Sequence, residues 1–308
     1  MSRNGLGSRK RAFVLALSIL AFSADSSLAS SLHEAAERGD LQQVRLLLSE
    51  GLSVNARDDR QRTSLHWAVQ EGHEPVAKLL VAGGADVNAR DKGGFTPLVE
   101  AVAHEDLGIA ELLVQNGADV NAVAEQGTSV LHAAATVREA ESVRFLLARG
   151  ADVSARDADG ETPLHRAVMT PQLNLLEEAR EGFLTEELLL GAGADVNAAS
   201  TDGTTPLGWA VMESNTKQAM FLIRNGANVN GRNHRTGIPL LHEAVFARDL
   251  AMVKVVVKGG ADLEARHDGR TAYEVAKQLR LAPIAAFLGR EMHQRPGRTG
   301  SPARDPSR

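Results

Sequence analysis

One short pattern recurs along the chain at a nearly constant spacing. The stretch "GADVNA" begins at Gly117 and again at Gly193, and close variants begin at Gly150, Gly226 and Gly260. A catalytic loop is normally needed only once, whereas a unit that stacks on copies of itself is needed many times. The recurrence therefore predicts a repetitive architecture, in which this stretch is the turn that ends one unit and leads into the next.

A second landmark gives the length of the unit. The leucine of "TSLHWAV" has counterparts at Leu32, Leu65, Leu98, Leu131, Leu164, Leu207 and Leu241, followed by Tyr273. Successive differences are 33, 33, 33, 33, 43, 34 and 32 residues, so the period is 33 with one insertion of ten. The first and last units lack the full pattern, as expected for the caps of a stack.

The residues within one unit predict two helices and a turn. Threonine is a good N-cap and proline suits the first helical position, so a helix begins at each "TPL". In the second unit Leu65, Ala68 and Val69 have helical spacing, and Val76 and Leu80 form a second apolar stripe. Glycines end both helices, and a polar stretch follows that is typical of a projecting turn.

The motif and the period together resemble the ankyrin repeat family. The sequence contains "TPLVEA" at Thr96, "TPLHRA" at Thr162 and "TPLGWA" at Thr205, with variants "TSLHWA" at Thr63 and "TSVLHAAA" at Thr128. The resemblance covers residues 31 to about 289. It implies an all-α solenoid of seven to eight helix-turn-helix units with projecting β-turn fingers, and it implies protein binding without catalysis.

The N-terminus has a different composition from the repeats. Residues 1–29 contain four basic residues, an 11-residue apolar run over 12–22, and small residues before a predicted cut after Ala29. This is the layout of a cleaved signal peptide, and the run is too short for a stable transmembrane helix. The sequence therefore predicts a periplasmic or secreted protein of a bacterium, with no membrane insertion after cleavage.

The domain boundaries follow from these features. Residues 1–29 are the predicted signal peptide and residues 30–289 the repeat domain, with the ten-residue insertion near 171–186. Residues 290–308 are rich in Arg, Pro, Gly and Ser, which predicts a disordered basic tail. The glutamates in and beside the insertion, among them Glu186, are expected to add charge to a lengthened loop, with a prolonged second helix as an alternative.

Charge and cysteine content exclude several functions. The net charge is -5, and removal of residues 1–29, which carry +3, leaves the mature chain near -8. Such a chain offers no broad cationic surface to phosphates, so we expect no nucleic-acid partner. The chain contains no cysteine, so an exported protein would form no disulfide and would rely on packing alone.

The histidines do not predict a metal site. His33, His66, His132, His165 and His242 fall at matching repeat positions. Helices pack about 8 to 10 Å apart, whereas zinc ligands lie about 2.0 to 2.1 Å from the metal, so these histidines cannot share one ion. We expect each to hydrogen-bond the threonine or turn of its unit. No nucleophile, phosphate-binding or zinc motif occurs, so we predict no cofactor, no metal and no catalytic residue.

The remaining functional element is a surface. The resemblance implies that a partner binds the concave side, formed by the turns and the exposed face of each first helix. Both tryptophans of the chain lie at the variable position after "LH", and aromatic, Met and Arg residues dominate binding hot spots. An alternative is that both tryptophans only pack on the neighbouring helix. The predicted partner-binding residues are Trp67, Glu71, Phe95, Glu100, His104, Arg166, Met169, Trp209, Met212, Glu243 and Phe246.

Three functional hypotheses remain at this point. The first is an exported, monomeric, non-enzymatic protein that binds another protein as a scaffold, stabiliser or inhibitor. The second is a secreted effector or adaptor that acts on another cell. The third is an enzyme with its site in the insertion, around Glu177, Glu178 and Glu181. Composition and motifs favour the first and give little support to the third.

Overall fold

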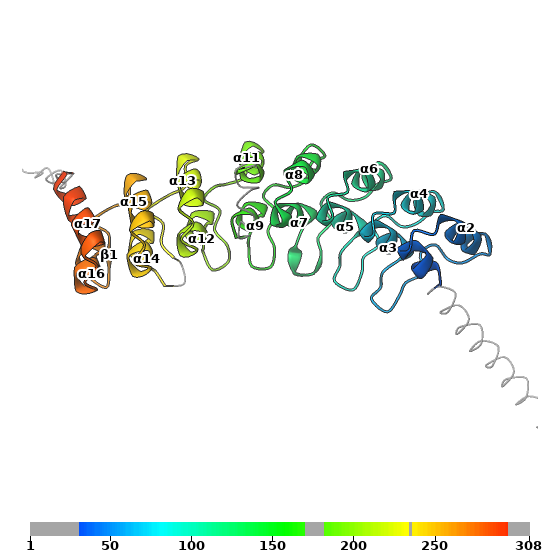
Figure 1. Ribbon diagram of the computed structural model, residues 1–308, viewed down its shortest axis with the longest axis horizontal. Helices are drawn as coiled ribbons and strands as arrows, with labels where there is room; N and C mark the ends of the chain where they lie inside the picture. The colour runs from blue at the N-terminus through cyan, green and yellow to red at the C-terminus, as the bar shows by residue number, and fades with distance from the viewer. Residues whose placement is uncertain (1–30, 170–181, 234–235, 295–308) are drawn as a thin grey trace, which may run out of the picture. The chain divides into compact units, whose positions relative to one another are not determined.

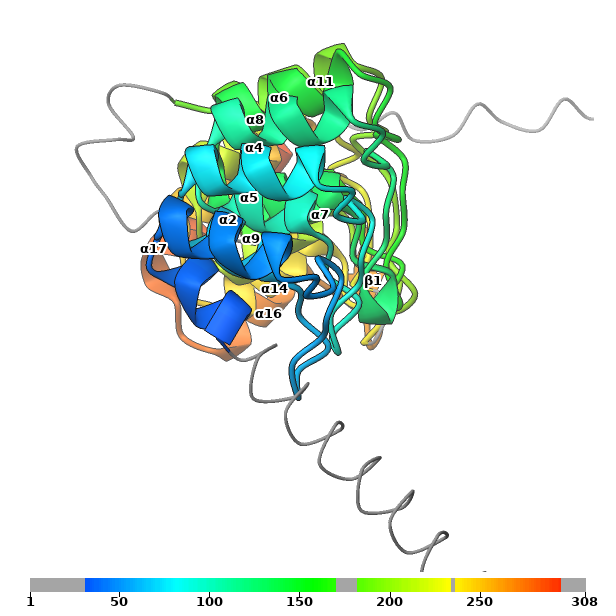
Figure 2. The same cartoon turned by 90° about the vertical axis from the view of Figure 1, so that its right-hand side faces the viewer.

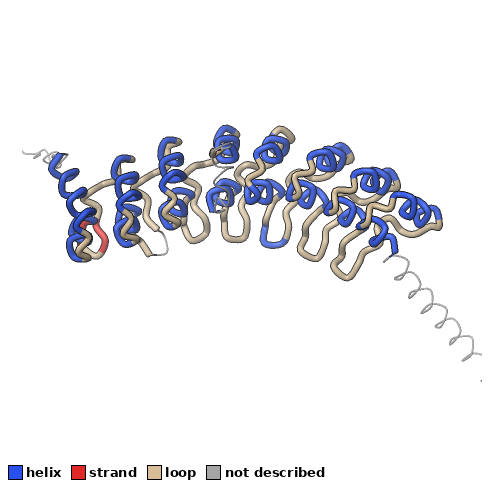
Figure 3. Tube along the Cα trace, in the orientation of Figure 1, coloured by secondary structure: helices blue, strands red, loops and turns tan. Residues whose placement is uncertain are grey.

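The computed structural model describes residues 31–169, 182–233 and 236–294. The chain divides into two compact units, Met1–Ala158 and Asp159–Arg308. Both units consist of helices joined by loops, and short strands occur only near the end of the described chain (Figure 3). The predicted signal peptide lies outside the described residues. None of the helices within the described ranges is long and apolar enough to cross a membrane.

The first unit is a series of short helix pairs. A helix over residues 31–37 is followed by α2 (Leu41–Ser49). The next pairs are α3 (Ser64–Gln70) with α4 (Glu74–Ala82), α5 (Pro97–Ala103) with α6 (Leu107–Gln115), and α7 (Val130–Val137) with α8 (Ala140–Leu147). A 3-10 turn, η1 (Glu125–Gly127), lies in the loop before α7. First helices contact first helices, since α5 packs against both α3 and α7.

The second unit has the same plan. Its pairs are α9 (Pro163–Met169) with α11 (Leu184–Gly191), α12 (Pro206–Met212) with α13 (Thr216–Arg224), α14 (Leu240–Phe246) with α15 (Leu250–Lys258), and α16 (Ala272–Gln278) with α17 (Ala282–Gln294) (Figure 1). The strands β1 (Arg266–His267) and β2 (Arg270–Thr271) form an antiparallel hairpin in the last connecting loop. The predicted helix-turn-helix repeat is therefore confirmed. We call the long loops that lead from one pair to the next the fingers, and within each unit they lie along one side (Figure 2).

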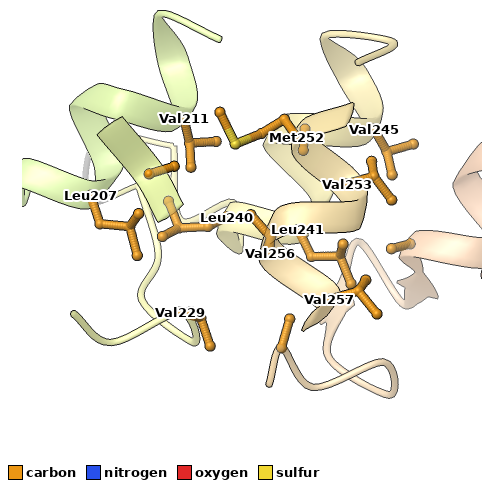
Figure 4. Packing of buried hydrophobic residues seen from close by; sticks show 14 of the residues in the cluster. Leu207, Val211, Val229, Leu240, Leu241, Val245, Met252, Val253, Val256 and Val257 are labelled. Atoms are coloured by element: carbon orange, nitrogen blue, oxygen red, sulfur yellow. The ribbon is translucent and has the colours of Figure 1, made fainter. Parts of the chain in front are cut away.

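Small and branched residues make the core between helices. An alanine lies three residues after the leucine of each first helix. Ala68, Ala101 and Ala244 are fully buried at this position and allow close approach of neighbouring first helices. Leu207, Leu241 and Val256 fill the space between the helix pairs of the second unit (Figure 4). One pair cannot bury its own apolar face, so each pair is stabilised by its neighbours.

The first helices begin at the predicted caps, with one shift. Thr63 caps α3, and proline occupies the first turn of α5 and α12. In the fourth repeat the cap is Ser129, whose hydroxyl accepts from the His132 N–H, so Thr128 lies one residue before the cap. Serine serves here because any short side chain with an oxygen can accept from the first turn.

The repeat histidines join one repeat to the next. The Thr63 N–H donates to His66 Nδ1 at 3.1 Å, so Nε2 carries the proton and donates to the Phe95 carbonyl oxygen at 3.2 Å. His165 makes the same link to the Thr204 carbonyl oxygen at 3.1 Å. The prediction that these histidines bond the threonine or the turn of their unit is confirmed for the threonine at His66 and His165, whereas the turn that they bond belongs to the following repeat.

The asparagine of "GADVNA" makes a second link between repeats. Asn88 donates through Nδ2 to the Gly117 carbonyl oxygen at 2.9 Å, and its Oδ1 accepts from the Asp119 N–H at 2.8 Å. Asn55, Asn121 and Asn197 make the same pair of bonds to their following repeats. Where the stretch carries this asparagine, it therefore binds the backbone of the following repeat.

The region after the insertion differs from its prediction. Residues 170–181, which hold most of the insertion, lie outside the described residues. The helix that follows, α11, has eight residues and is not prolonged. Glu186 does not add surface charge, because it is fully buried and accepts a hydrogen bond from Gln218 Nε2 at 2.7 Å. It occupies a position that is Ala77 or Ala110 in other second helices.

The C-terminal boundary also differs. Helix α17 continues to Gln294, so residues 290–294 are helical and do not belong to a disordered tail. Met292 explains the extension, because it packs against the core cluster of the second unit. The rest of the predicted tail, residues 295–308, lies outside the described residues.

The asparagine link gives a first testable prediction. Asn88→Ala should lower the free energy of unfolding by about 1–2 kcal/mol, because two inter-repeat hydrogen bonds are lost. Asn116→Ala is the control, since its side chain bonds only the Leu112 carbonyl oxygen of its own helix. Urea denaturation checks both variants. Equal midpoints for the two would contradict the role of Asn88 in joining repeats.

The buried histidines give a second prediction. Burial lowers the pKa of His66 from 6.5 to about 4, while the bond to Phe95 opposes this shift. The unfolded chain therefore binds more protons below pH 6.5, so stability that is complete above pH 6.5 falls as the pH drops toward 4. His66 alone should cost about 2 kcal/mol between pH 7.5 and pH 5.

Urea midpoints at pH 7.5, 6.5 and 5 measure this effect. His66→Gln should be less stable than wild type at pH 7.5, because the link is weakened, but it should lose less stability on acidification. An unchanged dependence on pH in this variant would show that His66 does not take up a proton on unfolding.

Candidate partner-binding surface

The predicted binding residues gather on one face of each unit. Trp67, Glu100, Arg166, Trp209 and Glu243 occupy the same position on α3, α5, α9, α12 and α14. Glu71 and His104 are the C-caps of α3 and α5, and Phe95 lies in the finger before α5. Met169, Met212 and Phe246 end α9, α12 and α14. First helices and fingers therefore form this face, which we call the finger face.

Trp67 is held within the fold of the first unit. Its Nε1 donates to Asp58 Oδ2 at 3.1 Å, and the Arg62 guanidinium lies 4.3 Å from the centre of its ring. The side chain of Arg62 is 7% exposed and pairs with Glu100 at 3.2 Å. Trp67 is half-buried rather than fully outward. The alternative that it packs within the fold fits this geometry.

Arg62 was missed by the sequence analysis although it organises this cluster. Besides Trp67 and Glu100, it donates to Gln70 Oε1 at 2.6 Å. The available signal was an arginine one residue before "TSLH", a position that projects toward the first helix of the following repeat. A cation beside an aromatic ring and a carboxylate is a stable arrangement when both are partly shielded from water.

The other predicted residues of the first unit do not form one cluster. Glu71 accepts from Gln70 Nε2 at 2.9 Å and is exposed. His104 Nε2 lies 3.9 Å from Glu100 Oε2, also at the surface. Phe95 is 37% exposed, and its contribution to the fold is the carbonyl oxygen that accepts from His66.

The second unit brings four predicted residues together around a cavity. The cavity has a volume of about 520 Å³ and is lined by Arg166, Met169, Trp209 and Met212. This volume lies in the range of about 300–1,000 Å³ that is usual for ligand pockets. Met212 is 46% exposed at its edge, whereas Trp209 is half-buried. We call it the Trp209 cavity.

The fingers add acidic residues to the Trp209 cavity. Asp159, Glu161 and Asp202 line it together with Ser200 and Thr204. None of these three residues was among the partner-binding residues predicted from the sequence. They could have been found from their positions, since each falls within the last six residues before "TPL" or "TTPL".

Two of these acids have defined partners. Glu161 Oε2 lies 3.2 Å from Arg166 Nε, and the Glu161 side chain is only 8% exposed. Asp202 Oδ1 accepts from the Ser200 hydroxyl at 2.7 Å and from the Thr204 N–H at 3.1 Å. Among the described residues, three carboxylates and one guanidinium line the cavity, so this part of its lining carries an excess of negative charge.

Glu243 and Phe246 lie on the next first helix and do not line the cavity. Glu243 Oε1 accepts from the Thr236 hydroxyl at 3.3 Å. Phe246 is 40% exposed and meets the His267 ring edge-on at 6.0 Å. Together with Met212 it provides exposed apolar area on the finger face.

The geometry of the finger face in the second unit suits the binding of another molecule. Within the described ranges, no cluster of three or more His, Asp or Glu residues is placed to hold a metal ion. The matching histidines lie in different repeats and are engaged with backbone groups. An apolar and acidic cavity with the exposed Met212 at its edge can hold a complementary side chain of another molecule.

Comparison with protein families gives the same picture. A family model described as "Ankyrin repeats (3 copies)" matches residues 32–124 and 175–267, and one described as "Ankyrin repeats (many copies)" matches residues 113–167. The chain belongs to the ankyrin repeat family. Ankyrin repeats are protein-protein interaction modules and are typically non-catalytic. No curated protein matches the chain.

The Arg62 cluster gives a third prediction. Glu100→Gln should lower the free energy of unfolding by about 1–2 kcal/mol, because the nearly buried Arg62 loses its carboxylate. Glu74→Gln is the control. Glu74 pairs with Lys78 on the surface, where both side chains are about half exposed, and such pairs contribute at most about 1 kcal/mol. Urea denaturation measures both. A cost for Glu100→Gln no larger than for the control would contradict the structural role of Glu100.

Proposed function

We propose that the protein is an exported, non-enzymatic binding protein that holds a partner protein against its finger face. The observation that carries the proposal is the Trp209 cavity, which has the exposed side chain of Met212 at its edge, while Phe246 is exposed on the next first helix. Methionine and aromatic residues at the edge of a cavity are typical of the centre of an interface. The partner is held as in a scaffold, stabiliser or inhibitor complex.

Export is the second part of the proposal. It is supported by the basic, apolar and small-residue segments of residues 1–29, which end just before the first repeat. The absence of cysteine from the whole chain is compatible with an oxidising compartment, since no thiol can be oxidised there. We propose a periplasmic or secreted location for the mature chain.

Site-specific photo-crosslinking in cells tests both parts, and the chain supplies a matched pair of positions. Met212 on the first helix α12 is 46% exposed, and Met220 on the second helix α13 is 40% exposed. Benzoylphenylalanine at position 212 should give a defined adduct in the extracytoplasmic fraction, whereas the same residue at position 220 should give none.

Two results would contradict the proposal. Equal adducts from positions 212 and 220, or adducts from 220 alone, would show that the finger face is not the binding surface. A chain that stays in the cytoplasm and retains residues 1–29 would exclude export while leaving the binding surface intact.

A further inference from the structure

The two tryptophans occupy equivalent positions but have different surroundings. Each follows the "LH" or "LG" pair of its repeat, Trp67 on α3 and Trp209 on α12. Trp67 is covered by the Arg62 guanidinium and bonded to Asp58. Residues of the same repeat therefore accept the hydrogen bond of the Trp67 indole and cover its ring.

The sixth repeat lacks both of these partners. The residue five positions before Trp67 is Arg62, and the residue five positions before Trp209 is Thr204. In the same way Ser200 stands where Asp58 stands, nine positions before the tryptophan. As a result Trp209 Nε1 is buried without a hydrogen-bond partner, and Thr204 and Ser200 line a cavity.

A carboxylate nevertheless occupies the position of Glu100 in the repeat that follows Trp209. Arg62 pairs with Glu100, which lies one repeat after Trp67 at the same helix position. One repeat after Trp209, that position holds Glu243. The aromatic ring and the carboxylate position therefore recur in the second unit, whereas Arg62 and Asp58 are replaced by Thr204 and Ser200, and Glu243 does not line the cavity.

The charges of the cavity fit a cation. Asp159, Glu161 and Asp202 line it, and Arg166, the one guanidinium among its described lining residues, is paired with Glu161. An incoming anion would meet this excess of negative charge, whereas an incoming guanidinium would be attracted and could stack on an aromatic ring. Met169 and Met212 offer apolar contact to the residues beside it.

We propose that the Trp209 cavity binds an arginine side chain of the partner protein, which takes at Trp209 the place that Arg62 takes at Trp67. This assignment rests on the proposed function and adds the chemistry of the partner. The partner presents an arginine flanked by apolar residues, which contact Met169 and Met212. The cavity exists because the sixth repeat has Thr204 in place of an arginine, and its acidic lining supplies the charge that attracts one.

Fluorescence of Trp209 tests the proposal directly. The chain has two tryptophans, so Trp67→Phe in the full chain leaves Trp209 as the only indole. The probe is acetyl-Leu-Arg-Leu-amide, and its control is the same peptide with uncharged citrulline in place of arginine. We expect a saturable change in Trp209 emission with the arginine peptide and at least tenfold weaker binding of the citrulline peptide. Equal responses to both peptides would overturn the proposal.

A second variant fills the cavity with an arginine of the chain itself. Thr204→Arg, in the Trp67→Phe background, restores the arrangement of the second repeat and should abolish binding of the arginine peptide. Thr216→Arg is the control, because it adds the same charge at the start of α13, away from the cavity lining. Binding that persists in Thr204→Arg, or is lost equally in both variants, would overturn the proposal.

The arginines of the chain's own C-terminal residues are competing occupants. Replacing Arg295, Arg298, Arg304 and Arg308 by Gln should leave the affinity for the peptide unchanged. A tenfold gain would assign the cavity to that segment instead of a partner. Crosslinking from position 212 in cells remains independent of these titrations. If it succeeds while the titrations fail, only the arginine assignment falls.

Discussion

Neighbouring repeats within each unit are joined by hydrogen bonds from side chains of one repeat to the backbone of the repeat that follows. His66 Nε2 donates to the Phe95 carbonyl oxygen, and Asn88 bonds both a carbonyl oxygen and an N–H of its following repeat. A helix pair buries its apolar face only against a neighbouring pair. These bonds fix how each repeat is aligned on the next, and so which apolar side chains are buried between them. They also make the fold sensitive to acid, because burial lowers the pKa of His66, which must stay neutral in the folded chain.

The same periodicity makes departures from it informative. When a backbone position recurs in each repeat, a change of side chain at that position changes the surface and leaves the fold intact. Arg62 completes the cluster around Trp67, whereas Thr204 leaves a cavity at Trp209. In the seventh repeat Pro239 stands where Thr63 stands, and it has neither an N–H nor a hydroxyl. His242 Nδ1 is accordingly buried without a partner.

Much of the fold could be predicted because its signals are local. Thr63 and Pro97 mark helix starts, and glycine after each second helix marks the turn. The candidate site was predicted less completely. The equivalent helix positions of Trp67 and Trp209 were evident from the sequence. Which residues contact the two indole rings depends on side chains from the fingers, which differ between the two repeats. Burial of Glu186 at an apolar position and the extension of α17 through Met292 are effects of packing that no local pattern encodes.

The sequence by itself determined the repeat, its period and the residues that cap and link each unit, because all of these recur at a fixed spacing of about 33 residues. Only the tertiary structure decided which side chains meet across that spacing. Arg62 reaches Glu100 across 38 positions, and Trp209 meets Ser200 and Met169 around one cavity. The physical reason is that a partner-binding surface in a repeat protein is assembled from one or two side chains per repeat, so its chemistry exists only once the repeats are stacked.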